Sequence, residues 1–240
     1  RKRPPRHRRG LGFSFVQLKT LPTLVNPEED PWTTLPRWFP EIAKEAWEGL
    51  AAYTELLREW NAKINLVSRK DTDRIEIKHL AHCLIATKFL RLMPKASLLD
   101  VGTGGGLPGI PLAICYPAAN FTLIDSIAKK IVAVEDMVAR LGLKNVTVIR
   151  GRAEELPAKR SFDFILGRAV TDLSVFYRWV RNKIRKGSHH APANGILYWK
   201  GGDYSKELET SRLRPAQVWD LAEHLPEAGL EEKYLVHFKI

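Results

Sequence analysis

The sequence predicts an α/β fold with a doubly wound, mostly parallel sheet. Three observations lead to this prediction. Residues 98–114 read as an apolar strand, a glycine-rich turn and a helix start, and residues 121–125 read as a second apolar strand that ends in a carboxylate. Strands and helices then alternate as far as residue 199, which is the pattern of parallel strands joined by crossover helices.

The turn after the first strand holds four glycines, at positions 102, 104, 105 and 106. Glycine is needed where the backbone takes a positive φ or where a ligand lies against the main chain. The free N–H groups of the following helix face such a ligand. Read from Gly104, the turn fits the dinucleotide fingerprint G-x-G-x-x-G; read from Asp100, it fits D-x-G-x-G-x-G of S-adenosylmethionine-dependent methyltransferases. The turn predicts a nucleotide-like cofactor, with a purely structural turn as the alternative.

Asp125 ends the second strand, about twenty residues after the glycines. A carboxylate at this place accepts hydrogen bonds from both ribose hydroxyls of a bound nucleoside. Because this holds for NAD and S-adenosylmethionine alike, Asp125 supports nucleoside binding without choosing between them. The alternative is an acidic cap for the helix that begins near Ile127.

The later elements complete the sheet. They are a helix at 127–141 ended by Gly142, strands at 146–149 and 162–166, a helix around 173–184 and a strand at 196–199. Ligands of such a sheet bind at the carboxyl ends of its strands. The residues that fall there are Gly102, Asp125, Ala153, Glu154, Arg168 and Lys200.

Residues 1–40 precede the folded region. Six of the first nine residues are Lys or Arg, and four prolines lie between Asn26 and Pro40. We expect a disordered basic arm, which fits an RNA-contacting arm, a targeting segment or a solvated tail. The proline-rich stretch predicts a linker that lies across the surface.

Residues 41–94 predict an N-terminal cap of two helices, because apolar residues recur every three or four positions over 42–60 and 75–89. Residues 95–240 form the sheet domain. One α/β domain with a small appendage is what 240 residues with 45% hydrophobic content allow.

The composition excludes several classes of protein. No apolar run approaches the roughly 18 residues of a membrane span, so we expect a soluble protein. Cys83 and Cys115 are too few for a disulfide framework or a metal site, and we expect buried free thiols in a reducing compartment. The net charge of +11 indicates a polyanionic partner.

Several motifs occur together in a fixed order. They are W-N-x-K-x-N-L at 60–66, D-V-G-T-G-x-G-x-P-G-I-P-L at 100–112, T-L-I-D-S at 122–126, R-A-E-E at 152–155, Arg168-Ala169 and Lys200-Gly201. Over residues 45–240 this combination resembles the bacterial small-subunit ribosomal RNA guanine-N7 methyltransferase family, known as RsmG or GidB.

The resemblance implies a seven-stranded, Rossmann-like class I methyltransferase fold. It implies S-adenosylmethionine as cofactor and 16S ribosomal RNA, or the small ribosomal subunit, as substrate of a cytoplasmic monomer with no membrane contact. The cofactor-binding residues it implies are Gly102, Gly104, Gly106, Leu107, Asp125, Ala153, Glu154 and Arg168. Two family motifs differ here: Ser-Arg-Ala has Gly167 in place of the serine, and His-x-x-Asp-Ser-Leu has His82 in place of the aspartate.

The expected chemistry needs no general acid or base. The chain lacks the Asn/Asp-Pro-Pro-aromatic loop that serves exocyclic amines, and its two cysteines fall in helices, away from a pyrimidine-methylating site. Guanine N7 has an in-plane lone pair, so catalysis reduces to positioning, for which we assign Arg168 and Lys200. The residues expected to contact RNA phosphates are Arg69, Lys70, Arg168 and Lys200, and we expect no metal.

Three other readings stay open at this stage. The first alternative is that Arg69, Lys70, Arg168 and Lys200 are ordinary solvated side chains with no role in RNA binding. The second alternative is that the whole chain is a methyltransferase that uses the same cofactor but acts on a small molecule. It is also compatible with a non-catalytic RNA- or nucleotide-binding module.

Overall fold

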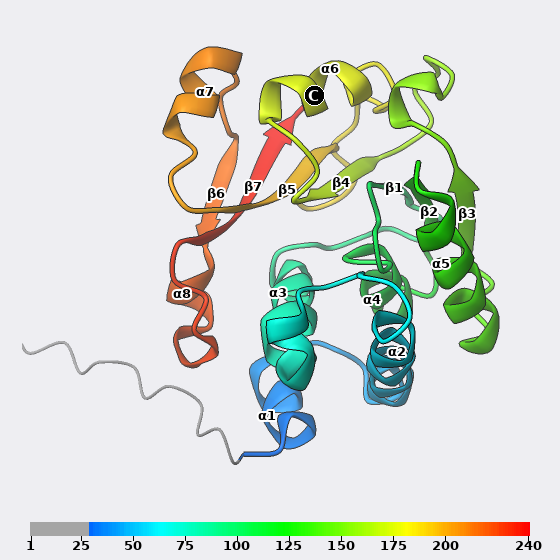
Figure 1. Ribbon diagram of the computed structural model, residues 1–240. Coiled ribbons are helices and arrows are strands. Elements are labelled where there is room, and N and C mark those ends of the chain that lie inside the picture. The colour runs from blue at the N-terminus through cyan, green and yellow to red at the C-terminus, as the bar shows by residue number, and fades with distance from the viewer. Residues whose placement is uncertain (1–28) are drawn as a thin grey trace, which may run out of the picture.

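The computed structural model describes residues 29–240 and contains one seven-stranded sheet in the order β3-β2-β1-β4-β5-β7-β6 (Figure 1). The strands are β1 (Ser97–Val101), β2 (Asn120–Asp125), β3 (Val146–Arg150), β4 (Phe164–Arg168), β5 (Gly195–Gly201), β6 (Gln217–Asp220) and β7 (Lys233–Lys239). Strands β1 to β5 pair in parallel, whereas β7 is antiparallel to both of its neighbours. The predicted doubly wound, mostly parallel sheet is confirmed.

Helices cover both faces of the sheet, as Figure 1 shows. The α-helices are α1 (Pro31–Trp38), α2 (Ala46–Asn61), α3 (Ala81–Leu84), α4 (Gly109–Cys115), α5 (Ala128–Arg140), α6 (Leu173–Val180), α7 (Ser205–Ser211) and α8 (Leu221–His224). The shorter helical turns are η1 (Arg69–Arg74), η2 (Glu76–Leu80), η3 (Ile85–Lys88), η4 (Ala153–Glu155) and η5 (Pro226–Ala228). None of these helices, within residues 29–240, is long and apolar enough to span a membrane.

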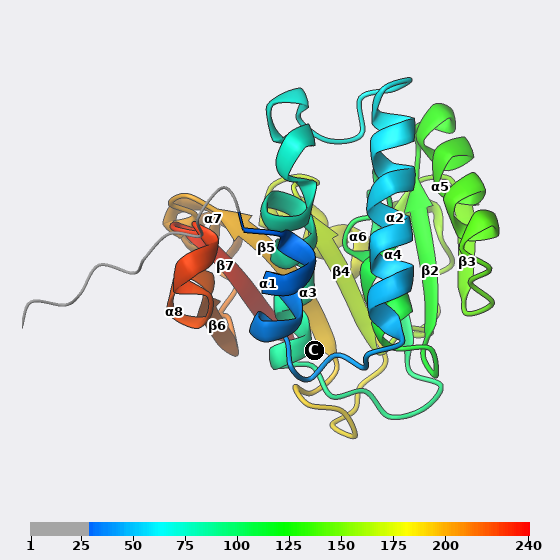
Figure 2. The ribbon, with the colours of Figure 1, turned by 90° about the horizontal axis from the view of Figure 1, so that it is seen from below.

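Alternation of side chains along each strand divides the core in two. On one face, β1 residues such as Leu98 pack with α1 to α5 and α8. On the other face, Leu99 and its neighbours pack with α6 and η4. Figure 2 looks onto the first helical layer, with α1 and α2 in front of the strands. The N-terminal helices therefore share a core with the sheet.

The proline-rich linker predicted up to Pro40 is wrong for residues 31–38, which form helix α1. The carboxylate of Asp30 accepts the N–H of Trp32 at 3.1 Å, and Pro31 occupies the first turn, where its missing N–H costs nothing. Leu35 and Trp38 are buried. Burial of this apolar face outweighs the general tendency of prolines to mark loops. The predicted basic arm, residues 1–28, lies outside the described residues.

The second predicted helix is present over residues 69–88, but its winding changes along its length. It begins as the 3-10 turn η1, becomes a π-helix in η2, continues as α3 and ends as the 3-10 turn η3. The π-helical turns carry His79. Such insertions are often found at functional sites.

Candidate active site

The glycine-rich turn between β1 and α4 is held from below by Asp100. Its side chain is fully buried, and Oδ2 accepts the Thr103 hydroxyl at 2.7 Å and the Gly109 N–H at 3.0 Å. Burial is the largest influence on this carboxyl and raises its pKa to about 7, against the lowering effect of the two hydrogen bonds. Asp100 therefore shapes the turn from within the core.

Three glycines of the turn adopt left-handed backbone conformations, with φ of +66° at Gly102, +59° at Gly104 and +88° at Gly106. A Cβ on Gly106 would lie 2.4 Å from Ile110 Cδ1, so this position has no room for a side chain. The Tyr53 hydroxyl of α2 donates to the Gly105 carbonyl at 2.8 Å. The turn is thus fixed from the helical layer as well.

Asp125 at the end of β2 is 7% exposed and already accepts two backbone N–H groups. Oδ2 accepts the N–H of Gly104 at 3.0 Å, and Oδ1 accepts the N–H of Ile127 at 2.9 Å. The carboxylate joins the loops that follow the two strands. The alternative of an acidic cap for the helix is wrong, because the N-cap residue of α5 is Ile127 and it makes no side-chain capping hydrogen bond. Each oxygen of Asp125 keeps one lone pair for a further donor.

A cavity of about 210 Å³ opens at the carboxyl ends of β1, β2 and β3. It brings together four of the sequence-predicted cofactor residues: Gly102, Asp125, Ala153 and Glu154. Gly104, Gly106, Leu107 and Arg168 do not line it, and the Leu107 side chain is buried in the core of the helical layer. The cofactor contacts expected of those four stay predictions.

Sequence reasoning missed other residues that line the 210 Å³ cavity, among them Val170 in the β4–α6 loop and Trp179 in α6. Val170 lies two residues after Arg168, and nothing in its sequence context marks it. Trp179 belongs to an amphipathic helix, where an aromatic residue reads as core. Both reach the cavity because α6 packs over the strand ends.

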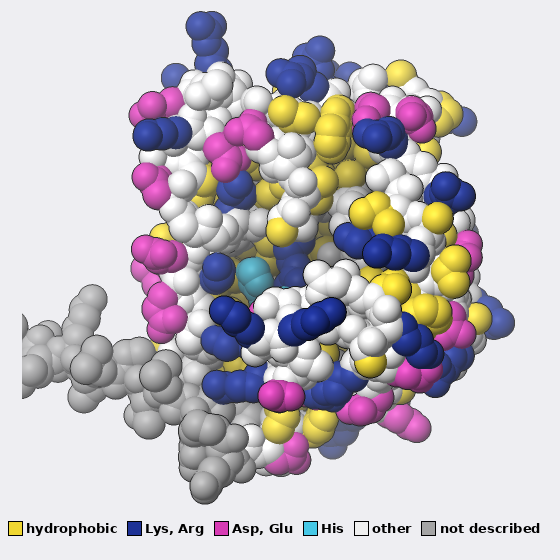
Figure 3. Space-filling view, viewed as in Figure 1, with side chains coloured by type: hydrophobic (Ala, Val, Ile, Leu, Met, Phe, Trp, Pro, Cys, Tyr) yellow, Lys and Arg dark blue, Asp and Glu magenta, His cyan; other side chains and the backbone are white. Residues whose placement is uncertain are grey.

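A second cavity, of about 590 Å³, lies beside the first. It contains the predicted Arg168 and Lys200, and also His79 and His82 of the altered His-x-x-Asp-Ser-Leu motif. Asp71, Lys78 and Lys233 line it too, and the sequence did not single out these three. Figure 3 shows a hollow on this face of the molecule, with a histidine visible in it and Lys and Arg side chains around it. The second cavity is strongly cationic.

The two cavities meet at the loop after β4. Val170 lines the smaller cavity, whereas its neighbours Ala169 and Thr171 line the larger one. The Tyr198 hydroxyl fixes this loop: it accepts the N–H of Thr171 at 3.2 Å and donates to the Thr171 carbonyl at 2.8 Å. A ligand in one cavity is therefore separated from a ligand in the other by a single loop.

Arg168 ends β4 and lies at this boundary. Its Nη2 lies 3.0 Å from His79 Nδ1, and its Nη1 lies 3.7 Å from Cys83 Sγ. Burial raises the pKa of the Cys83 thiol to about 11. Cys83 is thus a free, buried and protonated thiol, as the sequence predicted for a cysteine without a nucleophilic role. Cys115 is also a free thiol but is only half-buried.

Lys200 at the end of β5 is an ion-pair partner and not a solvated cation. Its Nζ lies 2.7 and 2.9 Å from the two carboxylate oxygens of Glu207 in α7. Trp199 beside it is 2% exposed and donates to the His82 carbonyl at 2.7 Å, so it belongs to the core.

Arg69 and Lys70 are exposed on η1 outside the 590 Å³ cavity, so RNA contact by them stays a prediction.

Gly167 stands where the family motif has serine, and the structure shows why a larger residue does not fit. A Cβ at this position would lie 2.7 Å from ring atoms of both Phe176 and Tyr198. The two rings meet edge to face, with centroids 4.7 Å apart. Aromatic packing occupies the space of the family's serine side chain.

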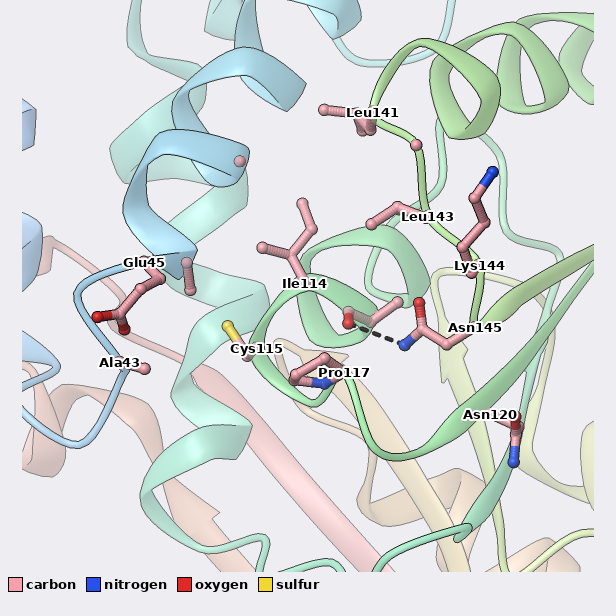
Figure 4. Close-up of a pocket in the computed structure, with 14 residues that line it drawn as sticks. Ala43, Glu45, Ile114, Cys115, Pro117, Asn120, Leu141, Leu143, Lys144 and Asn145 are labelled. Atoms are coloured by element: carbon pink, nitrogen blue, oxygen red, sulfur yellow. Dashed lines mark hydrogen bonds between the residues drawn. The ribbon is translucent and has the colours of Figure 1, made fainter.

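A third cavity, of about 640 Å³, lies at the opposite ends of the strands between α2 and α4 (Figure 4). The Asn145 amide spans its floor by donating to the Ala113 carbonyl at 3.0 Å. The cavity contains none of the predicted site residues. Because doubly wound sheets bind their ligands at the carboxyl ends of the strands, the two smaller cavities form the candidate active site.

Comparison with known proteins agrees with this geometry. The family model described as rRNA small subunit methyltransferase G, GidB, matches residues 46–230. Proteins named ribosomal RNA small subunit methyltransferase G are 43% identical in Christiangramia forsetii, covering 85% of this chain and 94% of that protein, and 44% identical in Flavobacterium johnsoniae, covering 85% and 96%.

Solved structures share the fold at much lower identity. A SAM-dependent methyltransferase from Aquifex aeolicus superposes with a TM-score of 0.51 at 17% identity, over 71% of this chain and 95% of that chain. The similarity is in the arrangement of sheet and helices.

Proposed function

The chain belongs to the rRNA small subunit methyltransferase G family, and from this premise we propose that it methylates N7 of a guanine in 16S ribosomal RNA with S-adenosylmethionine as methyl donor. The observation that supports the reaction most directly is the pair of adjoining cavities at the strand ends. One offers carboxylates and bare backbone, and the other is cationic. A nucleoside cofactor and a polyanion need these two environments.

We assign the 210 Å³ cavity to the cofactor. Asp125 and Glu154 supply acceptors for ribose hydroxyls and an adenine amine, and Ala153 offers a small apolar wall. Gly102 has no Cβ, so a ligand is able to approach its backbone. When bound, S-adenosylmethionine supplies an electrophilic methyl group on a sulfonium.

We assign the 590 Å³ cavity to the target guanine. N7 lies on the Hoogsteen edge, inside the narrow major groove of A-form RNA, so the nucleotide must be in a loop or turned out of its helix. Lys78 and Lys233 line the cavity from different layers of the fold. Within residues 29–240 neither forms an ion pair, in contrast to Lys200, so both are free to bind phosphates.

In this reaction the protein has to position the two reactants, and it does not have to transfer a proton. Guanine N7 attacks with a lone pair in the plane of the ring, so no side chain has to remove a proton. The new N–C bond forms as the methyl–sulfur bond breaks, and the positive charge passes from sulfur to the base. The chain's contribution is to hold nucleophile and methyl group in line, which is worth several orders of magnitude in rate. We assign this positioning to Arg168, because it lines the 590 Å³ cavity two residues before Val170 of the 210 Å³ cavity.

The test is methyl transfer from labelled S-adenosylmethionine to small ribosomal subunits and to stripped 16S rRNA, both from cells that lack this activity. Mass spectrometry of the product is expected to find 7-methylguanine at one site. Comparison of the two substrates identifies the form of RNA that is recognised. Binding of S-adenosylmethionine without transfer to either substrate would favour a small-molecule methyltransferase or a non-catalytic module.

The proposal also concerns the state of the protein in the cell. We propose a monomer that acts where ribosomal subunits are assembled, which in bacteria is the cytoplasm. Light scattering of the protein with and without RNA tests the first part.

A further inference from the structure

A chain of three polar side chains runs from the surface of the helical layer to the boundary of the two cavities. Asp71 belongs to η1, His79 to the π-helical η2, and Arg168 to the end of β4. His79 Nε2 lies 3.3 Å from Asp71 Oδ2, and His79 Nδ1 lies 3.0 Å from Arg168 Nη2. The chain thus connects the N-terminal helices to the candidate active site.

Geometry fixes the protonation of His79. A guanidinium is always a donor, so the Nδ1 atom that faces Arg168 must be the acceptor. The single ring proton is then on Nε2, which lies 3.3 Å from Asp71 Oδ2 in an electrostatic contact rather than a hydrogen bond. Burial, followed by the charge of Arg168, lowers the pKa of His79 to about 4, although Asp71 acts in the opposite direction. His79 is therefore neutral at physiological pH, in agreement with its contacts.

A neutral acceptor has a different effect on Arg168 from that of a carboxylate. Within the described residues 29–240, no carboxylate forms an ion pair with Arg168. His79 fixes the direction of the guanidinium without cancelling its charge. Asp71 contacts His79 and not Arg168. The residue at position 82, where the family motif has an aspartate, is a half-buried histidine beside the same guanidinium. Within residues 29–240, Arg168 therefore has no direct carboxylate partner that a phosphate would have to displace.

We propose that His79 is a positioning residue for methyl transfer, held by Asp71 in its Nε2–H form so that it directs the uncancelled charge of Arg168 toward a phosphate of the RNA. The inference rests on the proposed function, since it concerns the same reaction. According to this inference, the N-terminal helical layer contributes His79 and Asp71 to the site, and these two residues orient Arg168 of the sheet.

The experiment compares two substitutions of His79 that differ in one property. His79→Asn keeps an acceptor close to the position of Nδ1, whereas His79→Leu removes it. His79→Leu is expected to reduce kcat/KM for RNA by about 10- to 100-fold, with the Kd for S-adenosylmethionine unchanged. His79→Asn is expected to keep most of the activity. His189→Leu, at an exposed histidine that lines neither cavity, is the matched control and should match the wild type.

Two further readouts separate positioning from a merely structural role. The first is a double-mutant cycle that combines His79→Leu with Arg168→Lys. The double variant is expected to lose little more kcat/KM for RNA than Arg168→Lys alone, because both substitutions break the same contact. The ¹⁵N spectrum of His79 should show an unprotonated Nδ1. If His79→Leu does not fold, Asp71→Asn at a partly exposed position takes its place, with a smaller loss of kcat/KM expected.

The inference is overturned if His79→Leu methylates RNA like the wild type, if Asn and Leu lose activity equally, or if the Kd for S-adenosylmethionine changes while the KM for RNA does not. A protonated Nδ1 also overturns it. A wild-type protein that methylates no ribosomal RNA contradicts the proposed function instead, and the spectrum still decides whether His79 holds Arg168.

Discussion

The carboxylate of Asp125 accepts the backbone N–H of Gly104 at 3.0 Å, across 21 positions of sequence. The same carboxylate accepts the N–H of Ile127, so it sets the distance between the loops that follow β1 and β2. Both loops border the proposed cofactor cavity. The acidic residue expected to bind ribose is therefore also part of the scaffold on which the glycine turn rests.

Asp125→Asn is expected to weaken S-adenosylmethionine binding at least tenfold and to destabilise the fold by about 1–3 kcal/mol. An amide has one acceptor oxygen, so one of the two backbone N–H groups loses its partner. Calorimetric titration and urea unfolding measure the two effects. Asp172→Asn is the control, since the Asp172 carboxylate also accepts a backbone N–H, that of Ser174 at the start of α6, but lines neither cavity. Unchanged cofactor affinity in Asp125→Asn would contradict the assignment of the cavity.

Lys200→Met is expected to lower the free energy of unfolding by about 1–3 kcal/mol. The substitution leaves Glu207, whose side chain is 28% exposed, without the ammonium that faces both of its oxygens. The double variant with Glu207→Gln should recover part of the loss, because the uncompensated charge is then removed. Urea unfolding of the set checks this. If Lys200→Met keeps full stability but loses RNA affinity, the lysine acts chiefly on RNA.

The pH dependence of stability is expected to contain a contribution from Asp100. Its folded pKa of about 7 lies above the ordinary 3.8, so folding favours the protonated carboxyl. The stabilisation is fully present below about pH 4 and is lost as the pH rises through about 7, to a limit of about 4 kcal/mol. Asp100→Asn retains an acceptor but does not titrate. Its stability relative to the wild type should rise between pH 5 and pH 8 in urea unfolding; a constant difference would show that Asp100 is ionised throughout.

Gly167→Ser restores the residue of the family motif but is expected to destabilise this protein by about 1–3 kcal/mol. The added atoms meet the rings of Phe176 and Tyr198 at a distance that forces them apart. Thermal unfolding measures the effect. Gly151→Ser is a control for stability alone, because a Cβ there would meet Ile124 at an ordinary 3.8 Å. An unchanged Tm for Gly167→Ser would mean that the rings move freely.

Lys78→Gln and Lys233→Gln are each expected to weaken RNA binding and to reduce the slope of log affinity against log salt by about 1. The reason is that each unpaired ammonium releases counterions when it meets a phosphate. Fluorescence anisotropy over a salt series measures the slope. Lys144→Gln, at the 640 Å³ cavity by the opposite ends of the strands, is the control. An equal slope in all three variants would remove the 590 Å³ cavity from the RNA contact.

Local pattern was enough to predict most elements and some of the site. The periodicity of apolar residues located α2 and α5, and Gly142, with φ of +65°, ends the latter as predicted. Gly102 and Asp125 could be assigned to one cavity because the carboxyl ends of parallel strands meet at one edge. Helix α1 could not be predicted, since its stability comes from burial of Leu35 and Trp38 against other elements.

The sequence by itself determined the order of strands and helices from β1 to β5, the left-handed glycines of the first turn and the family to which the chain belongs. These features depend on residues close together in the chain, where periodicity and backbone preference act. Only the tertiary structure decided which side chains meet across elements: His79 with Arg168, 89 positions apart, and Lys200 with Glu207 across two elements. Such contacts depend on how layers pack, and packing is decided by the whole core and not by any local run of residues.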